Sequence, residues 1–257
     1  MLVNFFEEYP TFKNLEKARL IDFPSKIYLG APNIKKYYEH SKNLKRINND
    51  LKTAYWPIPQ RSLYIAPFSY AHDIESFISE IKRNEEELEV LIDLELPLTR
   101  KKLLITNAAS FKKNKELIEG IFLNQKEYNI RISTAEYPPT SSAEQAILTM
   151  LGLSYDLSKY EHNRIIMLYS SFDKIRIFNK LKKKHAAKQA RKYGEKFQVG
   201  LGTIATGILG NEPILTPKEL REDLSFLTNN GINTTVIYRL GGLTRKYLST
   251  IKEYAER

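Results

Sequence analysis

A buried strand is predicted for Leu88-Glu89-Val90-Leu91-Ile92-Asp93-Leu94-Glu95-Leu96-Pro97. The stretch is an apolar run that carries two carboxylates near its C-terminal end and stops at a proline. Because side chains two residues apart in a strand point to the same face, we expect Asp93 and Glu95 to project together. A carboxylate inside such a run is costly unless it is paired, hydrated at an opening or used in chemistry. This pair is therefore the first candidate for a functional site.

Strand-like segments of this kind recur along the chain and alternate with helix-like segments. Further strands are expected at residues 26–32, 51–58, 130–138, 164–172, 197–207 and 234–240. Between them, helical periodicity and capping residues predict helices, for example after Asn33, after Ser141 or Ser142, and after Thr216. Residues 103–106 fit either a short strand or the start of a helix. Residues 1–26 are predicted to form an amphipathic helical segment over one end of the core.

This alternation predicts an α/β fold with a parallel sheet and helices outside it. The number of segments and the length of 257 residues favour a closed (β/α)8 TIM-type barrel. An open parallel α/β sheet is the alternative, because one of the strands is uncertain. No linker rich in serine, glycine or proline divides the sequence, so we expect a single barrel domain over residues 1–257, with the helical segment 1–26 packed on it.

The composition narrows the function classes. The chain has no cysteine, which excludes disulfides, zinc–thiolate sites and cysteine nucleophiles, and its four histidines lack the spacing of metal ligands. We therefore expect neither a metal nor another cofactor. The first ten residues lack the pattern of a signal peptide, and no apolar run is long enough to span a bilayer, so a cytoplasmic location is expected.

Acidic and aromatic side chains gather at the predicted strand ends, which form the active-site face of a (β/α)8 barrel. Glu95, Asp93 and Glu136 are the carboxylate candidates for catalysis. The candidates for substrate binding are Tyr55, Trp56, Tyr137, Tyr238 and Arg239. Carboxylates and aromatic rings without histidine or cysteine favour sugar chemistry, because rings stack on pyranoses and a protonated carboxyl group can donate to a glycosidic oxygen. The competing structural interpretation is that such carboxylates cap helices or pair with Arg131 or Arg239.

Three short motifs stand at predicted strand ends: Asp93-Leu94-Glu95-Leu96-Pro97, Met167-Leu168-Tyr169 and Val199-Gly200-Leu201-Gly202-Thr203. They resemble, in that order, the end of the D-x-x-D-x-D-x-E signature, the M-x-Y strand end and the G-x-P-x-Y-G strand of chitinase-type, family 18 glycoside hydrolases. The resemblance implies a barrel in which Glu95 is the general acid, Asp93 orients an acetamido group of the substrate and Tyr169 supports the intermediate. Hydrolysis of a sugar polymer or glycoconjugate is the expected function.

The sequence departs from the pattern of that family at several positions. Leu88 and Leu91 replace the first two aspartates of the signature, and Ser170 replaces the aspartate that follows M-x-Y. The tryptophan of the last strand has no counterpart beyond Tyr238.

Other chemistry remains open at the same strand ends. Glu136 could act with Glu95 as nucleophile and acid, and carboxyl groups about 5 Å apart would give retention of configuration, whereas groups about 6.5–9.5 Å apart would give inversion. The glycines at 200, 202, 207, 241 and 242 could instead hold a phosphate, as in a phosphosugar lyase or isomerase. The spacing of glycines 200, 202 and 207 fits neither a dinucleotide fingerprint nor a P-loop, and tight packing with a turn is the competing interpretation.

The net charge of +10 resides almost wholly in one predicted helix. Residues 174–196 contain ten basic residues and one acid, whereas the remainder has 30 basic and 29 acidic residues. Apolar residues at helical spacing predict an outer barrel helix with a solvated face. The alternative function is a non-catalytic barrel that binds RNA or another polyanion through Lys182, Lys183, Lys184, Lys188, Arg191 and Lys192.

Overall fold

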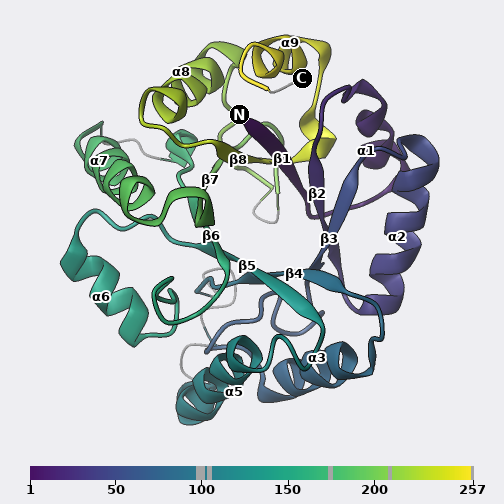
Figure 1. Ribbon diagram of the computed structural model, residues 1–257, viewed down its shortest axis with the longest axis vertical. Helices are drawn as coiled ribbons and strands as arrows, with labels where there is room; N and C mark the ends of the chain where they lie inside the picture. The colour runs from purple at the N-terminus through teal and green to yellow at the C-terminus, as the bar shows by residue number, and fades with distance from the viewer. Residues whose placement is uncertain (97–101, 103–105, 173–175, 208–209, 256–257) are drawn as a thin grey trace.

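The strands of the computed structural model close into a barrel in which β1 to β8 follow one another in chain order (Figure 1). The structure describes residues 1–96, 102, 106–172, 176–207 and 210–255. Neighbouring strands pair in parallel, and β1 closes the ring by pairing with β8. The strands are β1 (Leu2–Glu7), β2 (Lys26–Ala31), β3 (Lys52–Pro57), β4 (Leu88–Asp93), β5 (Ile130–Glu136), β6 (Asn163–Met167), β7 (Phe197–Gly202) and β8 (Thr234–Tyr238). The predicted (β/α)8 barrel is confirmed, and the open sheet is excluded.

The first strand corrects the prediction for the N-terminus. Helix was expected throughout residues 1–26, but Leu2–Glu7 form β1, and the helical part is limited to α1 (Phe12–Leu15) and a 3-10 helix at Glu16–Leu20. Phe5 lies opposite Ile27 of β2 and opposite Ile237 of β8, so two neighbours stabilise an apolar run that is too short to be recognised alone. Of the ambiguous segment 103–106, Thr106 is helical and residues 103–105 lie outside the described residues.

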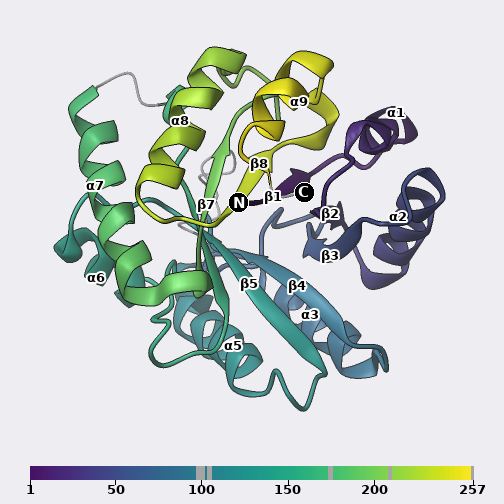
Figure 2. The ribbon, with the colours of Figure 1, turned by 45° about the horizontal axis from the view of Figure 1, so that its top comes forward.

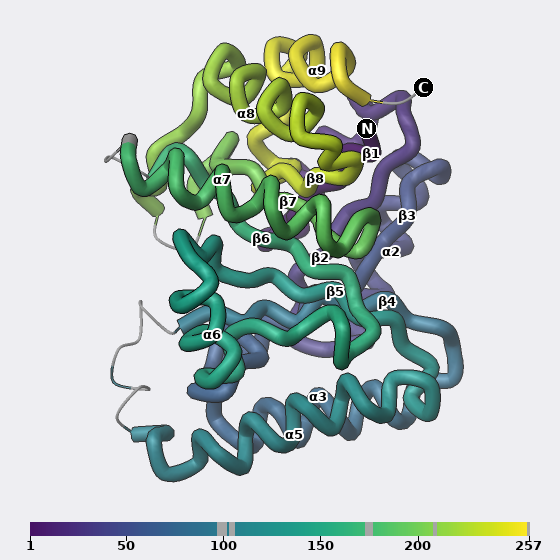
Figure 3. Tube along the Cα trace, turned by 60° about the vertical axis from the view of Figure 1, so that its left-hand side comes forward, coloured from purple at the N-terminus to yellow at the C-terminus, as the bar shows by residue number. Residues whose placement is uncertain are grey.

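Helices surround the strands on the outside (Figures 1 and 2). They are α2 (Ile34–Ile47), α3 (Ala71–Arg83), α5 (Phe111–Leu123), α6 (Ser142–Met150), α7 (Arg176–Tyr193), α8 (Pro217–Asn229) and α9 (Arg245–Lys252). The predicted caps are confirmed at Asn33, Ser141 and Thr216, and Thr216 forms a full capping box with Glu219. Figure 3 shows α7 between α6 and α8 on the outside of the barrel. In the described part of the chain no helix has both the length and the apolar character needed to cross a membrane.

The barrel interior has a core of its own, separate from the larger core beneath the helices. The inward-facing cluster consists of Phe6, Tyr28, Ala54, Trp56, Leu91, Ala135, Ile165, Met167, Val236 and Tyr238. Near the N-terminal ends of the strands, Lys26 Nζ binds Glu89 Oε1 at 2.6 Å, and the hydroxyl oxygens of Tyr28 and Ser133 are 3.4 Å apart. These polar contacts fill that end of the interior, and the opening lies at the C-terminal ends of the strands.

Candidate active site

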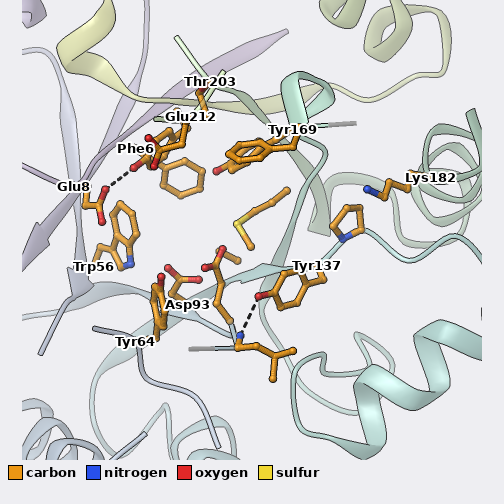
Figure 4. Close-up of a pocket in the computed structure, with 17 residues that line it drawn as sticks. Phe6, Glu8, Trp56, Tyr64, Asp93, Tyr137, Tyr169, Lys182, Thr203 and Glu212 are labelled. Atoms are coloured by element: carbon orange, nitrogen blue, oxygen red, sulfur yellow. Dashed lines mark hydrogen bonds between the residues drawn. The ribbon is translucent and has the colours of Figure 1, made fainter. Parts of the chain in front are cut away.

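A pocket of about 280 Å³ opens at the C-terminal ends of the strands, above the inner core (Figure 4). Its aromatic lining includes Phe6, Trp56, Tyr64, Tyr137, Tyr169 and Tyr238. Its charged lining consists, among the described residues, of Glu8, Asp93, Glu95, Lys182 and Glu212. Six of the residues expected to act in catalysis or substrate binding therefore lie together here: Asp93, Glu95, Trp56, Tyr137, Tyr169 and Tyr238.

The alternation of β4 places the acidic pair. Asp93 is the last residue of β4 and Glu95 follows two positions later, so both side chains reach the pocket from the same face. Pairing with β5 continues beyond the strand end, where the N–H of Leu94 donates to the carbonyl of Ala135 at 2.9 Å. Leu91, two positions before Asp93, belongs to the inner core. The same face thus changes from apolar packing to carboxylates as it reaches the opening.

Asp93 presents a buried acceptor to the pocket. Its side chain is 3% exposed, and its Oδ1 has no hydrogen-bond partner among the described residues. The donor beside this carboxyl group is the indole N–H of Trp56, which is also buried in the lining and whose hydrogen bond lowers the pKa of Asp93. Burial, the charge of Glu95 and the charge of Glu8 raise the pKa of Asp93 well above its usual value, and the Trp56 indole partly offsets them. Asp93 therefore reaches the pocket as a buried carboxyl group with the Trp56 indole beside it.

The carboxyl group of Glu95 has a raised pKa. Burial raises its pKa to about 7, while a hydrogen bond from Tyr64 lowers this pKa and the charge of Glu8 raises it. Tyr137 fixes the chain next to Glu95, because its hydroxyl accepts the N–H of Leu96 at 3.0 Å (Figure 4). A carboxyl group with a pKa near neutrality holds its proton under conditions in which an ordinary glutamate has lost it.

The first strand supplies two lining residues that the sequence analysis missed, Phe6 and Glu8. Glu8 follows β1, is 9% exposed and accepts a hydrogen bond from the hydroxyl of Tyr238 (Figure 4). Burial raises the pKa of Glu8, and the bond from Tyr238 opposes that shift. The sequence did contain a signal, because the apolar run of β1 ends in acidic residues just as the run of β4 does.

Tyr169, two residues after β6, and Tyr238, the last residue of β8, complete the aromatic wall. The rings of Tyr169 and Tyr238 have centroids 5.8 Å apart, and burial raises the pKa of both hydroxyls. A Cβ atom on Gly202 would lie 3.2 Å from the Tyr169 ring, and one on Gly207 would overlap the Tyr238 hydroxyl. Gly202, the last residue of β7, and Gly207, in the segment after it, therefore make room for these two tyrosines. This placement favours the packing interpretation of those glycines over a phosphate site.

Tyr55 and Arg239 were expected to face the substrate, and the structure places both outside the pocket. Tyr55 points to the outer side of β3, where its ring centroid lies 5.3 Å from that of Tyr37 and 6.1 Å from that of Phe77. Arg239 binds Glu7, with Nη1 2.8 Å from Oε1. Each is the strand neighbour of a residue that does line the pocket, so alternation turns it the other way.

Glu136 also points away from Glu95, which corrects the expectation that the two carboxyl groups meet. Its side chain is fully buried on the outer side of β5, where Oε2 lies 3.1 Å from Arg164 Nε and Oε1 accepts a hydrogen bond from Thr134 at 2.8 Å. Pairing with an arginine is the structural role considered for these carboxylates, although the partner is Arg164 and not Arg131 or Arg239.

Lys182 and Glu212 reach the pocket from outside the strands. Lys182 comes from α7, and Glu212 comes from the segment between β7 and α8. No periodic pattern in the sequence points to either, because their place depends on how α7 and that segment pack. Within the described ranges, no group of three or more histidine, cysteine, aspartate or glutamate side chains is arranged to hold a metal ion.

The basic helix α7 divides its charges between two sides. Lys182 lines the pocket, and Lys183 Nζ binds Asp223 Oδ1 of α8 at 2.8 Å. The remaining candidates for polyanion binding are exposed: Lys184, Lys188, Arg191 and Lys192. Lys180 is exposed as well, so a basic stripe runs at helical spacing along the outer face.

Comparison with known proteins gives a match in structure alone. No family model matches the sequence, and no curated protein matches it significantly. A GH18 chitinase from Pseudoalteromonas aurantia is similar in structure, with a TM-score of 0.59 and 11% sequence identity over 99% of this chain and 100% of that chain.

Two further solved structures are similar over nearly the whole chain. For the spore cortex-lytic enzyme SleL of Bacillus megaterium QM B1551 the TM-score is 0.53 and the identity 9%, over 99% of this chain and 74% of that chain. For the catalytic domain of beta-amylase from Paenibacillus polymyxa the TM-score is 0.52 and the identity 10%, over 100% of this chain and 99% of that chain. At these identities the likeness shows the fold, a (β/α)8 barrel shared with these three proteins, and the distant resemblance to chitinase-type barrels is confirmed at the level of the fold.

Proposed function

We propose that this chain is a glycoside hydrolase that acts on a sugar polymer or glycoconjugate, with Glu95 as its general acid. The observation that carries the proposal is the joint placement of Asp93 and Glu95 in one pocket with aromatic rings, at the C-terminal ends of the barrel strands. A GH18 chitinase among the structural neighbours supports it. The sequence resemblance supports it as well, since Asp93 and Glu95 match the end of the signature of that family.

The chemistry follows from the protonation states in the pocket. Glu95, with a pKa of about 7, donates its proton to the bridging oxygen as the bond from that oxygen to the anomeric carbon breaks. The leaving sugar departs as an alcohol, and water later adds a hydroxyl group to the anomeric carbon and returns a proton to Glu95. The family resemblance assigns to Asp93 the orientation of an acetamido group and to Tyr169 the support of the intermediate. Trp56, Tyr137 and Tyr238 offer ring faces and polar edges to the sugar units.

The pKa of Glu95 predicts the alkaline limit of the activity. A general acid works only in its protonated form, so we expect kcat/KM to fall by about tenfold for each pH unit above the pKa of about 7. The measurement is kcat/KM as a function of pH, on a glycan that a screen of oligosaccharides identifies as a substrate. Far-UV circular dichroism at each pH is the control for unfolding. Activity that keeps rising in alkaline solution would remove Glu95 from the role of acid.

A second function, binding of a polyanion such as RNA, is favoured by the outer face of α7. Lys180, Lys184, Lys188 and Arg191 are all exposed and follow one another at intervals of three or four residues. Residues so spaced lie on one side of a helix, and a row of cations on one side is the electrostatic pattern that phosphate backbones bind.

The exposed stripe can be tested by charge reversal. Changing Lys184, Lys188 and Arg191 to glutamate should abolish RNA binding at moderate salt. If some binding remains, the slope of log K against log salt concentration should become smaller by roughly 2, since three phosphate contacts to single-stranded RNA disappear. Exposed lysines of α2 provide the matched control with the same change in net charge: Lys35, Lys42 and Lys45 changed to glutamate. Equal losses in the two variants, or no RNA binding by the unmodified protein, would eliminate this second function.

A further inference from the structure

Large hydrophobic side chains are exposed on two neighbouring outer helices, α6 and α7. Six of the eleven that are exposed in the described part of the chain lie between residues 147 and 181. On α6, Ala143, Ala146, Ile147 and Met150 are all exposed, and their spacing places them on one side of the helix. No residue of α6 is buried, so this apolar side faces outward. An apolar stripe that faces solvent is a candidate contact surface.

α7 extends this surface in its N-terminal half, where Ile177, Phe178 and Leu181 are exposed. Phe178 and Leu181 precede His185 at helical spacing, so they share a side of α7 with it. Burial lowers the pKa of His185, and the charge of Glu144 in α6 opposes this shift, so this side of α7 is directed towards α6. Figures 1 and 3 show the two helices side by side. We call the exposed large side chains of both helices the apolar surface: Ile147, Met150, Ile177, Phe178 and Leu181.

Basic residues continue the outward row of α7. Ile177, Leu181, Lys184, Lys188 and Arg191 are exposed and follow one another at intervals of three or four residues, which places them on one side of the helix. The row is apolar in its first part and basic in the rest, and we call its last three residues the basic row. Among its 18 residues α7 has no aspartate or glutamate that could offset this charge.

The apolar surface adjoins the mouth of the pocket. α6 begins at Ser142, four residues after Pro138, and α7 begins at Arg176, four residues after Phe172. Both Pro138 and Phe172 line the pocket, and Phe172 is itself exposed. A partner that covers the apolar surface would therefore stand beside the opening of the pocket.

The charge of the basic row decides which partner fits the apolar surface. A second copy of this chain, docked through the same surface by a two-fold axis, would bring two basic rows together, and like charges repel. RNA would pair with the cations, but its phosphate backbone offers no apolar layer to aliphatic side chains such as Ile147 and Met150. A bilayer with anionic headgroups suits both parts, because it takes up apolar side chains and attracts lysine and arginine.

We infer that the apolar surface and the basic row together bind an anionic lipid bilayer. The apolar side chains lie just below the headgroups, and the cations lie at the level of the headgroup phosphates. Both parts contribute, because cations alone give an adsorption that salt screens, and the apolar side chains alone would bind neutral and anionic lipid equally. The inference goes beyond the proposed function and does not depend on it, since it concerns binding to lipid and not hydrolysis.

The test measures sedimentation of the protein with vesicles of phosphatidylcholine alone and with vesicles that contain about 30% phosphatidylglycerol. We expect the partition coefficient to be at least about tenfold larger for the anionic vesicles. The Ile147→Ser/Ile177→Ser variant should bind them at least about tenfold more weakly, because two large apolar side chains no longer insert. The matched control is Phe12→Ser/Leu123→Ser, which removes exposed side chains from α1 and α5 and should bind within about twofold of the unmodified protein.

Two further measurements keep the test decisive if a serine variant is unstable. Changing the basic row to glutamate should reduce binding to the anionic vesicles to the level seen with neutral ones. Because the chain has no cysteine, an Ile177→Cys variant can be labelled at that position alone with a fluorophore that senses polarity. Its emission should shift to the blue with anionic vesicles, whereas the same label in a Leu123→Cys variant should stay in water.

Several results would overturn the inference. They are the absence of binding to anionic vesicles, binding that the folded serine variant retains in full, and a label at residue 177 that stays in water. RNA binding without vesicle binding would assign the basic row to the second function and reject the bilayer. Self-association in the absence of lipid, if the serine variant abolished it, would assign the apolar surface to a second copy of the chain and reject the bilayer as well.

Discussion

Replacing Glu95 by glutamine is expected to lower kcat by about 10²–10⁴-fold on any glycan that the protein hydrolyses, the contribution that a positioned general acid typically makes. Glutamine keeps the size of the side chain and its ability to accept a hydrogen bond from Tyr64, but it cannot donate a proton to the glycosidic oxygen. The measurement is the initial rate of product formation for the two proteins at the pH optimum of the unmodified enzyme.

Glu89 supplies the matched control for this experiment. It lies on the same strand and the same inner face, but near the opposite end of the barrel, where it binds Lys26 at 2.6 Å. The Glu89→Gln variant should therefore retain kcat within about twofold as long as it is folded, because a substitution outside the pocket leaves the interactions that form in the transition state intact. Comparable losses in the two variants would mean that the effect arises from disturbance of the barrel and not from a missing acid.

The stability of the Glu95→Gln variant distinguishes a catalytic from a structural carboxylate. The pKa of Glu95 is raised in the folded protein from the ordinary 4.5 to about 7. Its contribution to the free energy of unfolding is therefore fully present below pH 4.5 and is lost as the pH rises through 7, because ionisation is less favourable in the folded protein than in the unfolded chain. Glutamine removes that loss. The melting temperature of the variant should match that of the unmodified protein in mildly acidic solution and exceed it in alkaline solution. A large fall in melting temperature at every pH would identify Glu95 as structural.

The sequence was sufficient for the barrel because most of its strands are apolar runs that end in turn residues or proline. It was not sufficient for β1, whose run from Leu2 to Phe6 is short and precedes two glutamates. This run becomes a strand because β2 and β8 flank it on both sides, which is a property of the closed barrel and not of the run itself. A barrel requires eight strands and the sequence analysis recognised seven, but the segment it considered for the eighth was 103–106 and not β1.

At the candidate site, the sequence could not show which of two adjacent strand residues points into the barrel. At three strand ends the sequence offered two adjacent candidates, and one member of each pair lines the pocket: Trp56, Tyr137 and Tyr238 do so, and Tyr55, Glu136 and Arg239 do not. Adjacent residues in a strand face opposite sides, so both members could not have been right. Which member of a pair faces the barrel interior depends on the register between strands. Residue type does not decide it, because tyrosine and charged residues occur both inside the barrel and beneath the outer helices. Tyr64, Lys182 and Glu212 lie beyond such reasoning, because loops and an outer helix position them.

Removing Glu136 is expected to have the largest effect on stability, since it leaves Arg164 as an unpaired buried charge. Both side chains are buried, at 0% and 2% exposure, and Oε2 of Glu136 lies 3.1 Å from Nε of Arg164. Breaking one partner of such a pair typically costs about 3–5 kcal/mol, because the remaining charge keeps its desolvation penalty. We therefore expect the Glu136→Leu variant to lose about that much of its free energy of unfolding, measured by urea denaturation.

The double variant Glu136→Leu/Arg164→Met is the decisive comparison, because it removes both charges and leaves apolar side chains of similar volume. Replacing a buried ion pair in this way is often neutral, so the double variant should recover more than about half of the stability lost in the single variant. It should also keep the hydrolytic rate, since Glu136 points away from the pocket that holds Glu95. If Glu136→Leu instead remained stable and abolished hydrolysis, Glu136 would be acting on the substrate, and the two carboxylates would have to meet in a conformation with a different register of β5.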